Sequence, residues 1–241
     1  FDEKGEKISK SKGNGISIDD WLKFASKESL ILYMYQNPRR AKKLTFDVIP
    51  KAVDEYQSFS EKYPNQEVKD QLSNPVFHIH DGNPIIIESP VTFSLILNLV
   101  SASQASSKEV IWGFIKGYFD DISEEASQYI DQLVVFALEY YKDFVLPTKK
   151  YRKPEKQEIE YLETLKENLL EMENETDPEK IQTIIYDIGM NSHFESLKDW
   201  FSALYEILLG QTQGPRLGSF IILYGVKEVI DLIDKAIEGK L

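Results

Sequence analysis

Apolar residues recur at intervals of three and four along most of this chain, and this spacing limits what it can fold into. A clear example lies between Asp47 and Pro64, where the series is Ile49, Val53, Tyr56, Phe59 and Tyr63. Such spacing places one apolar stripe along an α-helix, and proline then ends that helix. Similar patterns fill almost all of the chain after Ser89. The sequence therefore predicts an all-α protein.

Start and stop signals divide this pattern into separate helices. Ser17 followed by Asp20 resembles a capping box, which indicates a short helix with Trp21 on its apolar side. Ser89 is a suitable N-cap, and Pro90 suits the first position of the helix that would follow. The remaining predicted helices span 29–36, 47–63, 109–119, 123–145, 154–172, 178–190, 194–209, 216–224 and 226–237.

Residues 74–90 interrupt the helical pattern. Turn-forming sequences, Asn74-Pro75 and Asp81-Gly82-Asn83-Pro84, flank two short β-branched runs at 76–79 and 85–87. Proline, glycine and asparagine favour turns, whereas β-branched residues favour strands. We therefore expect a short loop or a small hairpin near 74–90.

Charge is distributed unevenly in this acidic chain of 241 residues. The net charge of −12 excludes a protein that binds nucleic acid over its whole surface, because phosphate binding needs local Lys and Arg. Residues 1–50 nevertheless hold ten basic and seven acidic side chains, whereas 155–187 hold three basic and eleven acidic ones. The acidic run should form exposed helix faces that repel RNA.

Composition also bounds the class of protein and its location. An apolar fraction of 42% is typical of a folded protein that buries a core. No apolar run approaches the roughly 20 residues of a membrane span, so we expect no membrane partner. The absence of cysteine excludes disulfides and thiolate metal sites. Cytoplasm is the expected location, and we expect a monomer.

The segment Lys7-Ile8-Ser9-Lys10-Ser11, with the glycine-containing stretch 12–15 behind it, carries the most informative chemistry. It combines closely spaced amines, small hydroxyl residues and flexible glycines ahead of a helix. Ammonium groups in such a loop can neutralise the charge that develops on pyrophosphate as ATP reacts. A solvated linker is the common alternative, and the residues alone leave both interpretations open.

The same segment resembles the KMSKS signature of class I aminoacyl-tRNA synthetases, with Ile8 in place of Met. Other segments are similar to the class I lysyl enzymes, so the resemblance covers essentially the whole chain. These segments are Lys12-Gly13-Asn14-Gly15, Trp21-Leu22, residues 34–42, residues 77–82 and Trp112-Gly113-Phe114.

The resemblance implies a parent ligase that activates lysine with ATP and charges lysine tRNA. It implies that Lys7 and Lys10 are catalytic, and that Ser9 and Ser11 join them in binding ATP, which Mg²⁺ accompanies. Residues 1–90 would form the KMSKS loop and a stem-contact helical region, and 91–241 the α-helical anticodon-binding domain. The catalytic nucleotide-binding domain, with the lysine pocket, would precede Phe1. We therefore expect the isolated chain to be inactive.

Three basic groups are candidates for tRNA contact. Arg39, Arg40, Lys42 and Lys43 follow Pro38 and are expected to contact the phosphate backbone. A second cluster, Lys149, Lys150, Arg152 and Lys153, is either solvated surface or a further tRNA contact. Arg216 lies in the glycine-rich turn 210–218, where it could stack on an unpaired anticodon base or cap a neighbouring carbonyl.

Two histidines and several aromatic residues invite other interpretations. His78 and His80 would lie on one side of an extended segment, but no third metal ligand is obvious. We assign no metal site and expect structural hydrogen bonds or tRNA contact instead. The aromatic residues at helical spacing are expected in the core. They are Trp112, Phe194, Trp200, Phe201 and Tyr205.

Two alternative functions remain open. The C-terminal half of a class I glutamyl-tRNA synthetase shares the signature loop and the helical cage, although residues 37–42 favour the lysyl enzyme. A non-catalytic RNA-binding module that retained the helical half of a synthetase would also carry these features. A nucleotide-binding motif upstream of Phe1 would separate an enzyme from such a module.

Overall fold

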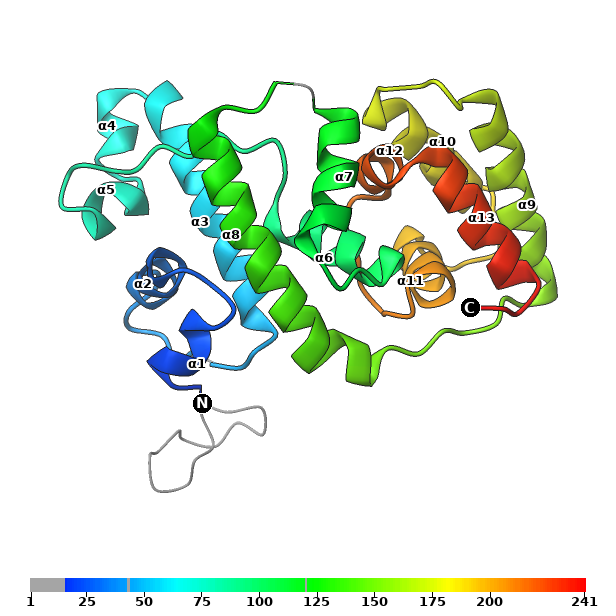
Figure 1. The fold of residues 1–241 in the computed structure, drawn as a ribbon, viewed down its shortest axis with the longest axis horizontal. Helices are drawn as coiled ribbons and strands as arrows, with labels where there is room; N and C mark the ends of the chain where they lie inside the picture. Colours follow the sequence, from blue (N-terminus) through cyan, green and yellow to red (C-terminus); the bar gives the residue numbers. More distant parts are fainter. Residues whose placement is uncertain (1–15, 43, 120) are drawn as a thin grey trace. The chain divides into compact units, whose positions relative to one another are not determined.

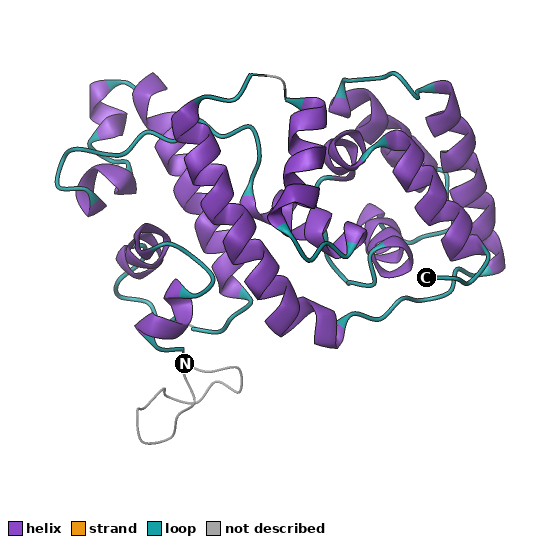
Figure 2. Ribbon diagram, in the orientation of Figure 1, coloured by secondary structure: helices purple, strands orange, loops and turns teal. Residues whose placement is uncertain are grey.

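The computed structural model describes residues 16–42, 44–119 and 121–241, and within them it contains helices and loops but no strand (Figure 1, Figure 2). This confirms the all-α prediction. Packing divides the chain into two compact units. The first runs to Ser94 and includes residues 122–140, and the second comprises 95–121 and 141–241. No described helix is both long and apolar enough to cross a membrane.

The first unit is built around α3 and a helix that returns to it from later in the sequence. Its helices are α1 (Ile18–Leu22), α2 (Lys27–Tyr35), α3 (Val48–Lys62), α4 (Val68–Gln71), α5 (Pro75–Ile79) and α8 (Glu124–Tyr140). Leu32, Tyr56, Val76 and Ile87 form one buried cluster, so α2, α3 and α5 share a core.

The start of the first unit confirms the predicted capping box. The hydroxyl of Ser17 accepts a hydrogen bond from the Asp20 backbone N–H, and the Asp20 carboxylate accepts from the backbone N–H and the hydroxyl of Ser17. Trp21 on this short helix is fully buried, and its indole N–H donates to Ser29 Oγ at 3.1 Å. Five residues of helix are thus fixed by a cap at one end and by a buried aromatic side chain.

The hairpin alternative for residues 74–90 is wrong, because the first β-branched run forms α5. Asn74 caps this helix by accepting from the Val76 N–H, and Pro75 occupies its first turn. The second run is an extended loop whose backbone bonds to a helix instead of a strand. Ser60 on α3 donates to the Ile85 carbonyl at 2.5 Å and accepts from the Ile87 N–H at 2.9 Å.

The helix predicted to begin at Ser89 starts later and uses a different cap. In α6 (Phe93–Ser103) the backbone N–H of Ser94 donates to the carboxylate of Asp54, which lies on α3. The Ser89 hydroxyl instead donates to the Val91 carbonyl at 2.8 Å. Burial raises the pKa of Asp54, although the hydrogen bonds from Ser94 oppose this. A carboxylate distant in sequence has replaced the expected local cap.

The second unit is a set of helices of 8 to 16 residues. After α6 they are α7 (Lys108–Tyr118), α9 (Lys156–Glu171), α10 (Pro178–Met190), α11 (Leu197–Leu208), α12 (Leu217–Tyr224) and α13 (Val226–Ile237). Of the five aromatic residues predicted for the core, Trp200 is buried and the other four are only partly buried. The Trp200 indole N–H donates to the Ile185 carbonyl at 2.9 Å. The last two helices confirm the predicted 216–224 and 226–237 to within one residue.

A close contact between α10 and α12 depends on a glycine. A β-carbon added at Gly218 would lie 2.2 Å from the Pro178 carbonyl oxygen, far inside van der Waals contact. The Gly218 N–H instead donates to the side chain of Gln182 at 2.8 Å. Only glycine allows the two backbones to approach this closely.

Arg152 holds the irregular segment ahead of α9 in place. Its guanidinium donates two hydrogen bonds to the Glu158 carboxylate, at 2.7 and 2.8 Å, and one to Glu206 at 2.9 Å. Glu158 also accepts from the Glu155 backbone N–H at 2.6 Å. Burial disfavours the charged form of Glu158, but these hydrogen bonds outweigh it and hold the pKa of Glu158 below its usual value. The carboxylate therefore stays ionised although the residue is buried.

We predict that Arg152→Ala lowers the free energy of unfolding by about 2 kcal/mol. Breaking a fully buried pair costs roughly 3–5 kcal/mol, and the loss here is smaller because Arg152 is partly exposed. Arg216→Ala is the matched control, since its pair with Glu179 is exposed on both sides and should contribute less than about 1 kcal/mol. Urea unfolding of both variants measures the difference, and equal losses would contradict the prediction.

The same pair should make stability depend on pH. Because the pKa of Glu158 is lowered on folding, its contribution is present above the unfolded pKa of about 4.3. It is lost as the pH falls through the lower pKa of the folded state. Arg152→Ala should therefore cost less at pH 3 than at pH 7, and an unchanged cost would contradict this account.

Candidate nucleic-acid interface

The segment with the strongest sequence signal lies outside the described residues. Lys7, Ser9, Lys10 and Ser11 all precede residue 16, and Lys43 is also not described. What the structure gives is the helix that follows them. Trp21 and the Ser17 cap fix this helix, α1, to the first unit.

Arg39 and Arg40 lie on a tight turn after α2. Helix α2 ends at Tyr35, and Asn37 then adopts a left-handed conformation with φ of 50°. The Arg40 N–H donates to the Asn37 carbonyl at 3.0 Å, which closes the turn. Both arginines are exposed, and the described part of the chain gives neither of them a carboxylate partner. Their charges are thus available to a ligand.

Lys42 belongs to the same predicted cluster, but its ammonium group contacts the protein itself. Its ammonium group donates to the Tyr33 carbonyl and lies 4.7 Å from the centre of the Tyr33 ring. Burial lowers the pKa of Lys42, although nearby Glu55 opposes this. Lys42 is thus engaged by the protein itself, whereas the two arginines are exposed.

The four arginines of the sequence fall into two classes. Arg152 is bound by two carboxylates, and Arg216 pairs with Glu179. In a chain with 40 acidic and 28 basic residues, acidic partners are plentiful. Arg39 and Arg40 nevertheless have none among the residues that the structure describes. Two adjacent unpaired guanidinium groups are a local exception to the acidic character of the molecule, and they suit phosphate binding.

The second basic cluster is partly structural. The Lys149 ammonium donates to the Ser101 carbonyl at 2.6 Å and lies near the rings of Tyr141 and Tyr151. Burial lowers the pKa of Lys149 to about 8. Arg152 is held by its two carboxylates. Lys150 and Lys153 are the exposed members, so this cluster presents less charge than its sequence indicates.

Arg216 stands at the N-terminal end of α12, in the glycine-rich turn. A β-carbon at Gly214 would meet the ring of Tyr205 at 2.4 Å, and the Tyr205 hydroxyl donates to the Pro215 carbonyl at 2.7 Å. These contacts fix the turn. Arg216 pairs with Glu179 and caps no carbonyl in the hydrogen bonds that the structure gives it. Its side chain is 55% exposed and that of Glu179 is 60% exposed, so the pair is weak and can open for a ligand.

His78 and His80 have separate partners because the segment is helical. The ring of His78 stacks on Tyr35, and its Nε2 lies 2.9 Å from the Leu72 carbonyl oxygen. His80 follows α5, and its Nε2 lies 3.1 Å from the hydroxyl of Tyr56. The geometry expected for an extended segment is therefore wrong. Among the described residues, no group of three His, Asp or Glu side chains is placed to hold a metal ion.

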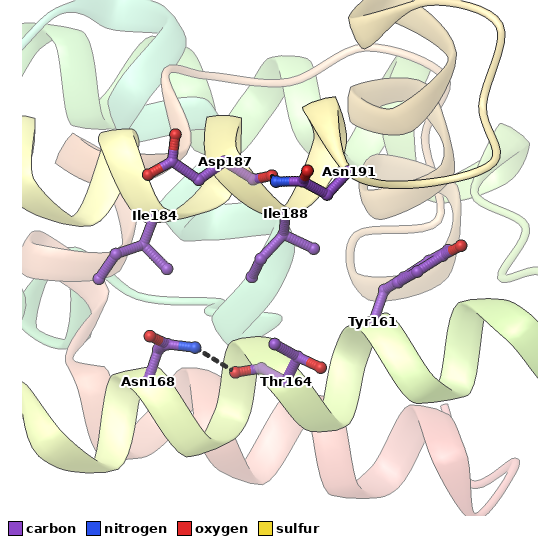
Figure 3. Close-up of a pocket in the computed structure, with 7 residues that line it drawn as sticks. All are labelled: Tyr161, Thr164, Asn168, Ile184, Asp187, Ile188 and Asn191. Atoms are coloured by element: carbon purple, nitrogen blue, oxygen red, sulfur yellow. Dashed lines mark hydrogen bonds between the residues drawn. The ribbon is translucent and has the colours of Figure 1, made fainter.

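A cavity in the second unit had no sequence signal, since ordinary amphipathic helices line it. It lies between α9 and α10 and has a volume of about 370 Å³ (Figure 3). Ile184 and Ile188 project from α10 toward Thr164 and Asn168 on α9, and the Tyr161 ring lies at one end. The one charged lining residue is Asp187. Without a lysine or arginine in its lining, this cavity does not suit a phosphate group.

Comparison with known proteins identifies what this chain resembles. Residues 1–83 match the family described as tRNA synthetases class I (K). The whole chain is 51% identical to "Lysine--tRNA ligase" of Rickettsia felis and of Rickettsia peacockii, and 50% identical to that of Rickettsia rickettsii. Each match covers 100% of this chain and 46% of the relative, so the chain spans about half the length of these relatives. By this similarity, the chain belongs to the class I lysyl-tRNA synthetase family.

Proposed function

We propose that this chain is the part of a class I lysine–tRNA ligase that supplies the loop that closes over ATP and the surfaces that bind tRNA. The observation that supports this most is the identity of about 51% across the whole chain. The parent would activate lysine with ATP to lysyl-adenylate and then esterify the 3′ end of lysine tRNA. The proposal includes a cytoplasmic, monomeric protein.

The loop at 7–11 would act on the leaving pyrophosphate. Lys10, assisted by Lys7, would place ammonium groups where negative charge develops as the α-phosphate is attacked. Ser9 and Ser11 would shape the loop and donate hydrogen bonds to phosphate oxygens. Mg²⁺ would arrive with ATP, since this ion is usually held by substrate phosphates together with one or two carboxylates.

The chain would contact the tRNA in two ways, through its phosphates and through an anticodon base. Arg39 and Arg40 would bind phosphates of the stem, which every tRNA shares, within a stem-contact region spanning 1–90. Arg216 would read an unpaired anticodon base within the helical domain spanning 91–241. The weak ion pair with Glu179 supports this role, because a guanidinium held by an exposed carboxylate is already oriented and is released at little cost.

In the intact parent enzyme, Lys10→Ala should slow adenylate formation roughly 100-fold while lysine binding changes little. Removing a charge that is aimed at the transition state costs on the order of 3 kcal/mol in the barrier. ATP–pyrophosphate exchange measures this rate. Lys27→Ala, an exposed lysine beyond α1, is the control and should leave the rate unchanged. Exchange by the Lys10 variant at the unsubstituted rate would remove Lys10 from the mechanism.

Replacing both Arg39 and Arg40 with Ala should weaken native and anticodon-replaced lysine tRNA equally. The slope of log affinity against log salt should become shallower by about two, because two phosphate contacts are lost. Lys27→Ala combined with Lys51→Ala is the matched control, since it removes two charges from the same unit at lysines that have acidic neighbours. If both double variants change the slope equally, net charge and not position governs binding.

Arg216→Ala should shrink the preference for native over anticodon-replaced tRNA. Loss of one stacked or hydrogen-bonded base is worth roughly 1–3 kcal/mol. Glu179→Ala separates the ion pair from RNA contact, because it breaks the same pair but frees the guanidinium. That variant should keep or increase the preference. Titration of both tRNAs with all three proteins tests this, and an unchanged preference in Arg216→Ala would exclude the residue from anticodon reading.

A further inference from the structure

A pair of stacked rings lies on the surface of the first unit. Tyr35 is the last residue of α2, and His78 belongs to α5. Their ring centroids are 5.6 Å apart and their planes are inclined by only 19°. Tyr35 is 45% exposed and His78 is also exposed. Helices α2 and α5 thus contact each other through two stacked rings that remain exposed to solvent.

The protein fixes one ring of this pair more firmly than the other. The His78 imidazole bonds to the Leu72 carbonyl, and the ring of Phe77 lies perpendicular to it at 5.3 Å. Tyr35 has no ring contact other than His78 among the described residues. Tyr35 is therefore the ring with fewer contacts, and the fixed His78 ring beside it reduces the entropy that would be lost when a ligand stacks on Tyr35.

The turn that follows Tyr35 carries the two unpaired arginines. Only Gln36, Asn37 and Pro38 separate the exposed ring from Arg39 and Arg40. An aromatic face beside guanidinium groups is the combination that binds single-stranded nucleic acid, because the ring stacks on a base while the cations hold its phosphates. The surroundings of Tyr186, which is 43% exposed, differ: Asp187 follows it directly, and the ring of Phe201 packs against it.

We propose that Tyr35, backed by His78, is a stacking site for an unpaired nucleotide of an RNA whose adjoining phosphates are bound by Arg39 and Arg40. This rests on the proposed function, since it adds a base contact to the phosphate contacts of the same surface. The site selects unpaired over paired nucleotides. It does not select a sequence, because every base presents a π-face.

Two RNA hairpins test this proposal with the 241-residue chain. One carries a single-stranded 3′ extension, and the other has the same stem with a blunt end. Tyr35→Leu should weaken binding of the extended hairpin roughly tenfold, the loss expected for one stacked base, and leave the blunt hairpin within about twofold. Tyr35→Phe should restore the preference. Tyr186→Leu is the matched control and should bind both hairpins like the unsubstituted chain.

Salt dependence and a spectroscopic signal distinguish the possible failures. Tyr35→Leu should keep the salt slope, whereas the Arg39 and Arg40 double variant should flatten it and keep the preference for the extension. In the unsubstituted chain, the extended hairpin should shift the NMR signals of the His78 ring protons, and the blunt one should not. An unchanged preference in Tyr35→Leu, or the absence of that shift, overturns the stacking site while the phosphate contacts stand. Failure of the unsubstituted chain to bind either hairpin overturns both.

Discussion

The second unit depends on how Arg152 is held. Between the end of α8 and the start of α9 the chain has no regular helix long enough to bury an apolar stripe of its own. Arg152 compensates by donating to carboxylates on α9 and α11, while the backbone N–H groups of Lys150 and Arg152 donate to the carbonyls of Gly210 and Glu206. The guanidinium and these backbone hydrogen bonds together hold the irregular segment and the turn that leads to Arg216.

The pairing of acidic with basic side chains determines where this acidic molecule retains local positive charge for a polyanion. Glu158, Glu206 and Glu179 neutralise two of the four arginines, and a tyrosine ring and a backbone carbonyl engage Lys42. The turn after α2 is left with two positive charges. Because screening limits the reach of surface charges to about 10 Å, this local excess matters more to an approaching phosphate than the total of −12.

The sequence sufficed for most helices because their signals are local. The capping box of Ser17 and the apolar stripe of α3 depend on neighbours within one or two turns. The structure of residues 74–90 is harder to predict from sequence, because Ser60, which is distant in sequence, forms hydrogen bonds with the backbone of Ile85 and Ile87. The cap of α6 by Asp54 and the stacking of Tyr35 on His78 are likewise contacts between separate elements, which periodicity does not encode. Arg39 and Arg40 were found as candidates, but only the structure distinguishes them from Lys42.

The close approach of α12 to α10 at Gly218 determines how the ion pair between Arg216 and Glu179 can open. With α12 seated directly on the first turn of α10, Arg216 and Glu179 are carried by backbones that cannot slide past each other without a steric clash. Opening of their pair is then a rotation of side chains on a rigid frame, which occurs within nanoseconds in exposed residues. Ionic strength, and not a slow domain movement, would set how often the guanidinium of Arg216 is released.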